Sequence, residues 1–160
     1  MRLTQAAVAA EHERIRDDER VVTLVNDTRD RLGDAFDVSV SHVTPAQYRA
    51  EVDTVFADGD TAVNVAALVG ILRELDVEGD YPGFVVDELL GRELAGTIAA
   101  TKGRAYSLLA EATFHYADIH THGEDGENAG EDDLAAALAA GFQTRLPGWE
   151  WTESESPFGV

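Results

Sequence analysis

The first stretch of the chain, residues 4–32, has the apolar spacing of a helix. Apolar or small residues recur there every three or four positions, at Val21 or Val22, Val25, Thr28 and Leu32. Gly33 follows directly, and glycine is typical of the position just after a helix. The early part is mostly alanine and charged residues, so we expect one helix with a wide solvated face.

Residues 35–43 alternate between apolar and polar positions, which predicts a strand. One face would carry Phe36, Val38, Val40 and His42, and the other would carry Asp37, Ser39 and Ser41. A period of two is that of a half-buried strand. Because the edges of a lone strand have unpaired backbone groups, we expect it to pair within this chain, with another copy or with a different protein.

Two further helices follow, and both have clear local signals. Thr44, Pro45 and Gln47 form the pattern of a capping box with proline at the first helical position. The buried stripe of this helix would be Tyr48, Val52, Val55 and Phe56. Residues 58–60 end it and begin the next helix, whose apolar positions are Val65, Leu68, Val69, Leu72 and Leu75. Residues 78–83 then interrupt the helical pattern.

Residues 84–120 are compatible with one long helix, or with two helices separated by a kink. A bulky stripe at four-residue spacing is formed by Val86, Leu90, Leu94 and Ile98. A stripe of small residues lies beside it, formed by Gly91, Ala95, Ala99, Gly103 and Ser107. Small side chains let a second backbone approach closely, so we interpret this stripe as an interaction face. The alternative is that the glycines only weaken or kink the helix.

The C-terminal part is predicted as a short helix followed by a tail. After an acidic loop at 124–133, the helix would run from about Asp132 to Leu146 and stop at Pro147. The tail carries Trp149, Trp151 and Phe158, which we expect to dock on this body, on a neighbouring copy or on a partner. The sequence therefore predicts a mainly α protein: a helical bundle with one long helix, a minor β strand or hairpin element and an extended C-terminal tail. Residues 1–147 would form a single helical domain and residues 148–160 a docking tail.

The charge of the chain changes the setting in which this fold is expected. There are 31 acidic residues against 12 basic ones, giving a net charge of −19, and Lys102 is the only lysine. Molar salt shortens the Debye length to about 3 Å, which converts such self-repulsion into a hydrated, solubilising coat. An acid-rich, lysine-poor composition resembles that of cytoplasmic proteins of halophilic archaea and their viruses. An acidic mesophilic protein that mimics DNA is the alternative, but here the acidic residues are spread through every segment.

Several classes of function are disfavoured by composition. The absence of cysteine excludes disulfides, thiolate zinc sites and a cysteine nucleophile. The N-terminal stretch turns polar after Ala10, and the apolar run 62–72 is too short to span a membrane. We therefore expect no membrane association and a location in the cytoplasm of a halophile, or in a virion assembled there. The basic cluster, Arg14, Arg16, Arg20, Arg29 and Arg31, is interleaved with acids, so it is interpreted as a solvated face without nucleic-acid binding.

The strongest chemical pattern lies near residue 115. It consists of Glu111, His115, Asp118, His120 and His122, whose first members share one helical face. Imidazoles with carboxylates are ligands for zinc, iron or manganese. The spacing nevertheless departs from the usual zinc-helix motif and from the Glu-x-x-His pattern of ferritin-like bundles. The alternative is a polar helix end whose histidines are favoured by the helix dipole. We expect no catalytic residue and no cofactor beyond a high concentration of potassium or sodium ions.

The strand, the small-residue stripe and the aromatic tail all favour contact with protein rather than with a small molecule. The leading hypothesis is a structural or assembly protein that binds other subunits, as a homo-oligomer or within a larger assembly. In general organisation the chain resembles head–tail adaptors (connectors) of tailed viruses, which implies a virion component of a haloarchaeal tailed virus. Two alternatives stay open. One is a metal-binding helical protein or enzyme that uses Glu111, His115 and Asp118, and the other is a halophilic cytoplasmic regulator that binds a protein partner.

Overall fold

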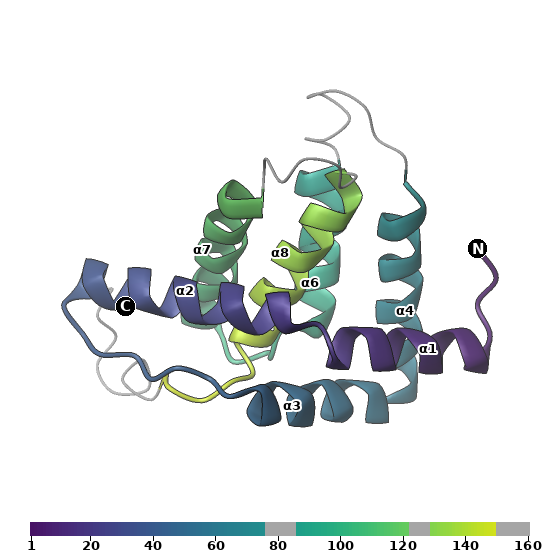
Figure 1. Ribbon diagram of the computed structural model, residues 1–160, viewed down its shortest axis with the longest axis horizontal. Coiled ribbons are helices and arrows are strands. Elements are labelled where there is room, and N and C mark those ends of the chain that lie inside the picture. The colour runs from purple at the N-terminus through teal and green to yellow at the C-terminus, as the bar shows by residue number, and fades with distance from the viewer. Residues whose placement is uncertain (76–85, 122–128, 150–160) are drawn as a thin grey trace.

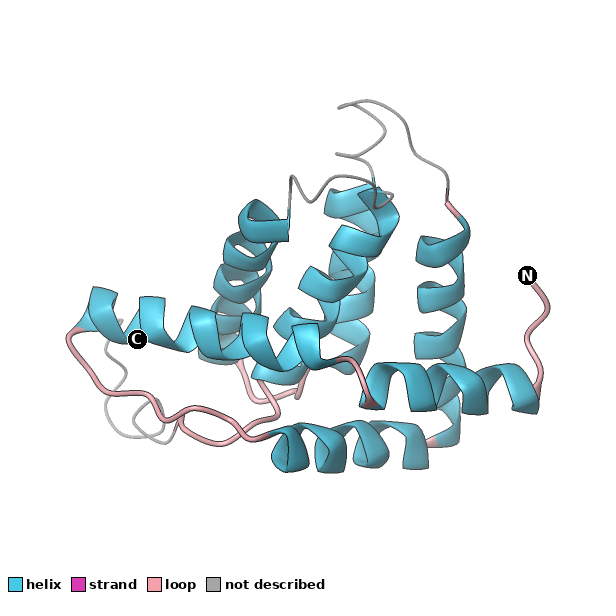
Figure 2. Cartoon of the chain, in the orientation of Figure 1, coloured by secondary structure: helices cyan, strands magenta, loops and turns pink. Residues whose placement is uncertain are grey.

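The computed structural model describes residues 1–75, 86–121 and 129–149. Within these residues the protein has seven α-helices, one π-helical turn and no strand (Figures 1 and 2). The elements are α1 (Gln5–Arg16), α2 (Glu19–Phe36), α3 (Pro45–Ala57), α4 (Gly59–Glu74), the π-helical turn η1 (Val86–Gly91), α6 (Arg92–Ile98), α7 (Arg104–Thr121) and α8 (Ala129–Gln143). The prediction of a mainly α protein is confirmed.

The helices form two groups that cross each other. In Figure 1, α4, α6, α7 and α8 stand upright, while α1, α2 and α3 lie across one end of them. Helix α8 is at the centre, because it packs against α7, α6, α2, α4 and η1. Residues 133–144 are all buried, so α8 forms the middle of the hydrophobic core. No single helix in the described residues is long and apolar enough to cross a membrane; only α3 and α4 together, bent by 108°, meet that criterion.

The prediction of one N-terminal helix is wrong, because two helices, α1 and α2, take its place. They meet at Asp17 and Asp18, where the Asp18 side chain accepts a hydrogen bond from the backbone N–H of Arg20 at 3.1 Å. An aspartate at this N-cap position supplies one of the bonds that a helix start lacks, so it permits a new helix here. At the other end, Gly33 does not stop α2, which continues to Phe36.

The predicted strand at 35–43 is also wrong. Residues 35 and 36 belong to α2, and residues 38–44 form a loop that returns along α2. Side chains of α2 replace a neighbouring strand: the Asn26 amide nitrogen donates to the Val43 carbonyl at 3.0 Å, and the Val43 N–H donates to the Asn26 amide oxygen at 2.7 Å. On the predicted apolar face only Val40 is buried, whereas Phe36, Val38 and His42 are exposed, so the alternation does not correspond to burial.

Helix α3 begins as predicted. The Gln47 N–H donates to the Thr44 hydroxyl at 3.2 Å, and the Thr44 N–H donates to the Gln47 side chain at 2.9 Å, which completes the capping box. Tyr48, Val52 and Val55 are buried as expected. The Tyr48 hydroxyl donates to the Ile15 carbonyl at 2.7 Å, and burial, reinforced by the nearby Asp18 carboxylate, raises the pKa of Tyr48 well above its ordinary value.

The predicted long helix over 84–120 is wrong as well. Its described part consists of η1, α6 and α7, and the chain leaves helical geometry at residues 99–103. Ala99 has an extended ψ of 143°, and Gly103 has a φ of +100°, a conformation that favours glycine. The chain thus changes direction at Ala99 and Gly103. This agrees with the alternative interpretation, in which the glycines interrupt the helix. The final helix begins at Ala129, before the predicted start near Asp132.

Candidate functional site

The break between α6 and α7 is held in place by the end of α8. The Ala100 N–H donates to the Thr144 hydroxyl at 2.9 Å, and the Arg145 guanidinium donates to the carbonyl of Ile98. These bonds satisfy backbone groups that a helix end and a loop would otherwise leave unpaired. Since α8 is buried along most of its length, the break is anchored to the core rather than to a free loop.

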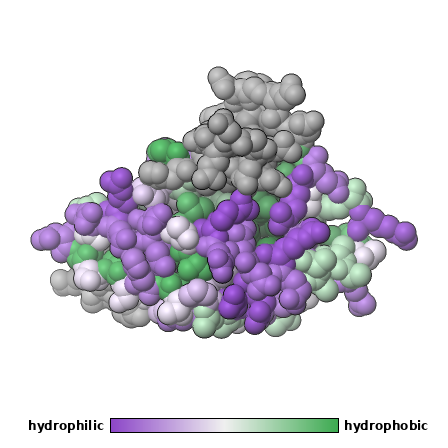
Figure 3. Space-filling model, in the orientation of Figure 1, coloured by the Kyte–Doolittle hydropathy of each residue, from purple (hydrophilic) through white to green (hydrophobic). Residues whose placement is uncertain are grey.

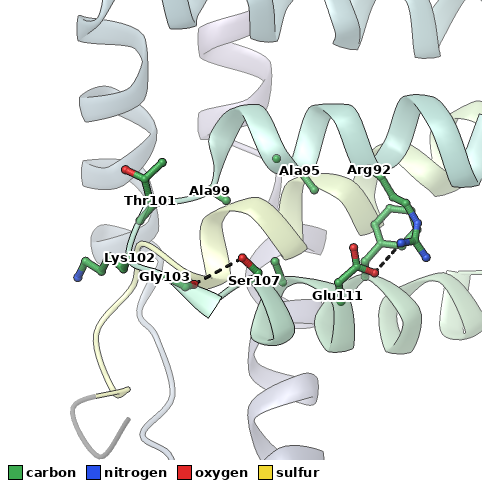
Figure 4. Close-up of a pocket in the computed structure, with 12 residues that line it drawn as sticks. Arg92, Ala95, Ala99, Thr101, Lys102, Gly103, Ser107 and Glu111 are labelled. Carbon is green, nitrogen blue, oxygen red and sulfur yellow. Dashed lines mark hydrogen bonds and ion pairs between the residues drawn. The ribbon is translucent and has the colours of Figure 1, made fainter. Parts of the chain in front are cut away.

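A groove of 460 Å³ opens between α6 and α7 (Figure 4). Four members of the predicted small-residue stripe, Ala95, Ala99, Gly103 and Ser107, line it. The rest of the lining is Arg92, Gly96, Ala100, Thr101, Lys102, Ala110, Glu111 and Phe114. The remaining predicted member, Gly91, is buried at the end of η1 and lies outside this lining. Most of the stripe therefore borders an open groove, although Gly91 and Ala95 are themselves buried.

The charges at the groove differ in sign from those of the whole chain. Arg92 and Lys102 are basic, and Glu111 is the one acidic residue among the lining residues described. Arg92 donates to the Glu111 carboxylate at 2.8 Å, which ties α6 to α7 across the groove. Lys102 lies over the Tyr106 ring, 5.4 Å from its centroid, at the end of the groove next to the break. A chain of net charge −19 thus has a groove with one more cation than anion.

The comparisons with known proteins give the family of the chain. A family model described as a domain of unknown function, DUF7984, matches residues 1–160. The chain belongs to this family. No curated protein and no solved structure matches the chain. Since the family's description names no activity, the function of this member is proposed below from the groove itself.

The predicted metal ligands do not form a cluster in the part of the chain that the structure describes. Glu111 is half exposed and is engaged by Arg92, and His115 is exposed to solvent one helical turn further along α7. Asp118 is half buried on the same helix. The side chain of His120 and the whole of His122 lie outside the described residues. The arrangement at Glu111 is that of an interhelical ion pair.

The first aromatic residue of the predicted tail belongs to the body. Trp149 is 2% exposed, packs in a cluster with Val40 and Tyr106, and donates from its indole nitrogen to the Gln143 carbonyl at 3.1 Å. Of the three docking sites expected for the tail aromatics, which were this body, a neighbouring copy or a partner, Trp149 uses the body of its own chain. Trp151 and Phe158 lie outside the described residues, so docking of the remaining tail stays a prediction.

A buried arginine, Arg29, fastens this region to α2. Arg29, interpreted as part of a solvated face, is 1% exposed. Its guanidinium donates to the Gln143 side chain at 2.8 Å and to the carbonyls of Ser41 and Pro147 at 2.8 and 2.6 Å. The signal for its burial was its position four residues after Val25, on the apolar stripe of α2. The chain after α8 is thus held against α2 by a buried charge.

Proposed function

We propose that the protein is a structural or assembly component that binds other protein subunits through the groove between α6 and α7. The observation that carries this proposal is an open, mostly apolar groove whose shape is fixed by contacts with the buried helix α8. Protein interfaces combine an apolar centre with a polar rim in which arginine is enriched. The small side chains of Ala95 and Ala99 with Arg92 at one end match that pattern.

The electrostatics of the rest of the surface give this groove its selectivity. The face on which α1 and α2 lie carries many hydrophilic side chains (Figure 3), and the net charge of the chain repels other acidic proteins at low salt. A partner that is itself acidic would meet attractive charges at Arg92 and Lys102. The groove is therefore suited to partners of the same acidic character as this chain.

The most specific form of the proposal is a head–tail adaptor in the virion of a haloarchaeal tailed virus. Its support is the acid-rich, lysine-poor composition, together with a helical body that has a prepared docking groove. This form rests on general organisation, and the broader assembly role does not depend on it.

The test is the size of the particle with which the natural protein travels. Sedimentation of lysate from its source, held in molar KCl, is expected to place the protein in a large assembly. Migration as a free chain of 17.3 kDa would contradict the assembly role. In a source that carries the variant, Gly96→Trp should release the protein from the assembly. A Cβ atom at Gly96 meets no atom within 4 Å, and Gly96 lines the groove, so the indole would occupy the space that a partner needs. The matched control is Gly59→Trp, at a helical glycine that is equally open and lies outside this groove.

A further inference from the structure

The groove and the C-terminal residues of the chain are complementary in charge. Residues 150–160 contain three glutamates, Glu150, Glu153 and Glu155, and no lysine or arginine. The groove lining contains Arg92 and Lys102 against the single acid Glu111. An acidic segment approaching most of this protein would be repelled, whereas at the groove it would meet a local excess of positive charge.

The same segment also supplies apolar side chains for an apolar groove. Trp151 and Phe158 flank the two later glutamates in the sequence. The volume of 460 Å³ is within the range of about 300–1,000 Å³ that is typical of sites that enclose a bulky group. Because Gly96, Ala99 and Gly103 line the groove with small or absent side chains, an extended segment meets little steric hindrance there.

The last described residue lies next to the groove. Trp149 packs in one cluster with Tyr106, and the ring of Tyr106 carries Lys102, which lines the groove. Trp149, which precedes the C-terminal segment, is therefore linked to the Lys102 end of the groove through the Tyr106 ring. If two copies pair about a twofold axis, binding of this segment in the other copy's groove is reciprocal.

We propose that the groove of one copy binds residues 150–160 of a second copy, so that two copies exchange their C-terminal segments. This inference rests on the proposed function, since it names the partner for the same groove. Arg92 and Lys102 hold the glutamates, and one aromatic side chain occupies the apolar centre between α6 and α7.

The absence of cysteine from the chain permits a direct test by disulfide formation between two full-length variants. Ser107→Cys places a thiol in the groove, and Ser156→Cys places one in the C-terminal segment. One variant is labelled with heavy nitrogen, so that the mixed dimer has its own mass. Under mild oxidation in molar KCl, the mixed dimer is expected to form several-fold faster than with Ser41→Cys, an exposed serine outside the groove. Equal rates with Ser107→Cys and Ser41→Cys would overturn the proposal.

A second result separates exchange between copies from docking within one chain. The double variant Ser107→Cys/Ser156→Cys, diluted strongly, should form little intrachain disulfide. If it closes rapidly within one chain while the mixed pair does not react, the segment binds its own groove and the exchange is refuted. The charge contribution is tested by adding Lys102→Glu to the Ser107→Cys variant, which should slow mixed-dimer formation several-fold. The control is Arg2→Glu, which makes the same change of charge at an exposed site outside the groove and should leave the rate unchanged.

The same samples distinguish failure of this inference from failure of the proposed function. If the natural protein sediments in a large assembly but no groove-specific disulfide forms, the assembly role stands and the segment is not the partner. If the protein sediments as a free chain and no groove-specific disulfide forms, both are refuted.

Discussion

The two sides of α6 use small residues in opposite ways. On the side of α8, a Cβ atom placed on Gly141 would lie 2.7 Å from the Cβ of Ile98 and 3.0 Å from the Ala95 carbonyl, so the two helices are in close contact. On the side of α7, a Cβ placed on Gly96 would meet no atom within 4 Å, and a groove of 460 Å³ lies open. One short helix thus has a closed face and an open face.

A small residue in a helix therefore indicates close helix packing only where a second helix lies against it. Helix α8 lies alongside α6, and Gly141 makes room for Ile98. Helix α7 follows α6 after the break at 99–103, and the small residues before and after the break come to surround empty space. The closed face stabilises the fold, and the open face is left for a partner.

The largest expected effect is on the closed region, at the buried Arg29. Arg29→Ala removes the hydrogen bonds to the Gln143 side chain and to the Ser41 and Pro147 carbonyls, and leaves the buried Gln143 side chain without this partner. A hydrogen bond to a charged group contributes about 1.5–3 kcal/mol, so the loss of three such bonds should lower the unfolding free energy by at least about 3 kcal/mol. Urea unfolding in molar KCl measures this loss. Arg31→Ala, an exposed arginine on the same helix, is the control and should leave the midpoint unchanged. A midpoint for Arg29→Ala equal to that of the control would contradict the anchoring role.

The next effect tests the close contact itself. Gly141→Ala forces a methyl group against Ile98, whose β-carbon cannot rotate away. Overpacking of this kind costs about 1–3 kcal/mol, partly offset by the roughly 1 kcal/mol by which alanine favours a helix over glycine. A net destabilisation of up to about 2 kcal/mol is therefore expected in urea unfolding. A more stable variant would show that α6 and α8 are further apart than described.

Local signals in the sequence predict some elements of this fold and fail at others for identifiable reasons. The capping box at Thr44 and the buried stripe after it were predictable, because cap and stripe lie within one helix. The false strand at 35–43 arose because Asn26 and Arg29 bind the loop backbone in place of a strand, and periodicity does not reveal such distant partners.

The groove too was predictable only in the features that depend on local sequence. Its small lining residues Ala95, Ala99 and Gly103 were singled out from the sequence, but they were assigned to a continuous helix. The break that opens the groove depends on Thr144 and Arg145, which lie more than forty residues further along the chain. The small residues of the lining were therefore predictable, whereas the basic residues beside them and the shape of the groove were not, because the shape depends on long-range contacts.

On the open face of α6, a substitution at Gly96 should change the unfolding free energy in the direction opposite to that expected for Gly141→Ala. Gly96→Ala adds a methyl group that meets no neighbouring atom, within a helix where alanine is preferred over glycine. The unfolding free energy should rise by about 0.5–1 kcal/mol. The measurement is the same urea titration, with Gly141→Ala as the matched comparison. A loss of stability at both glycines would mean that α6 is closed on both sides.

The smallest effect tests an electrostatic contact remote from both faces of α6. Asp53 on α3 accepts hydrogen bonds from His12 at 2.8 Å and from Arg16 at 3.0 Å, both on α1. Desolvation raises the pKa of Asp53, but the hydrogen bonds from His12 and Arg16 outweigh it, so that the pKa lies below its ordinary value of 3.8.

A carboxylate with a lowered folded-state pKa adds stability above its unfolded pKa and loses it as the pH falls through the folded value. Asp53→Asn should therefore cost about 0.2–1 kcal/mol at neutral pH, as for a surface ion pair. The difference in unfolding free energy between Asp53→Asn and the natural chain should vanish in acid, below the folded-state pKa. The difference in unfolding free energy between Gly96→Ala and Gly141→Ala involves no ionisable group, so it should keep its sign. Urea unfolding at neutral and acidic pH measures both, and an Asp53→Asn cost that grows on acidification would refute the lowered pKa.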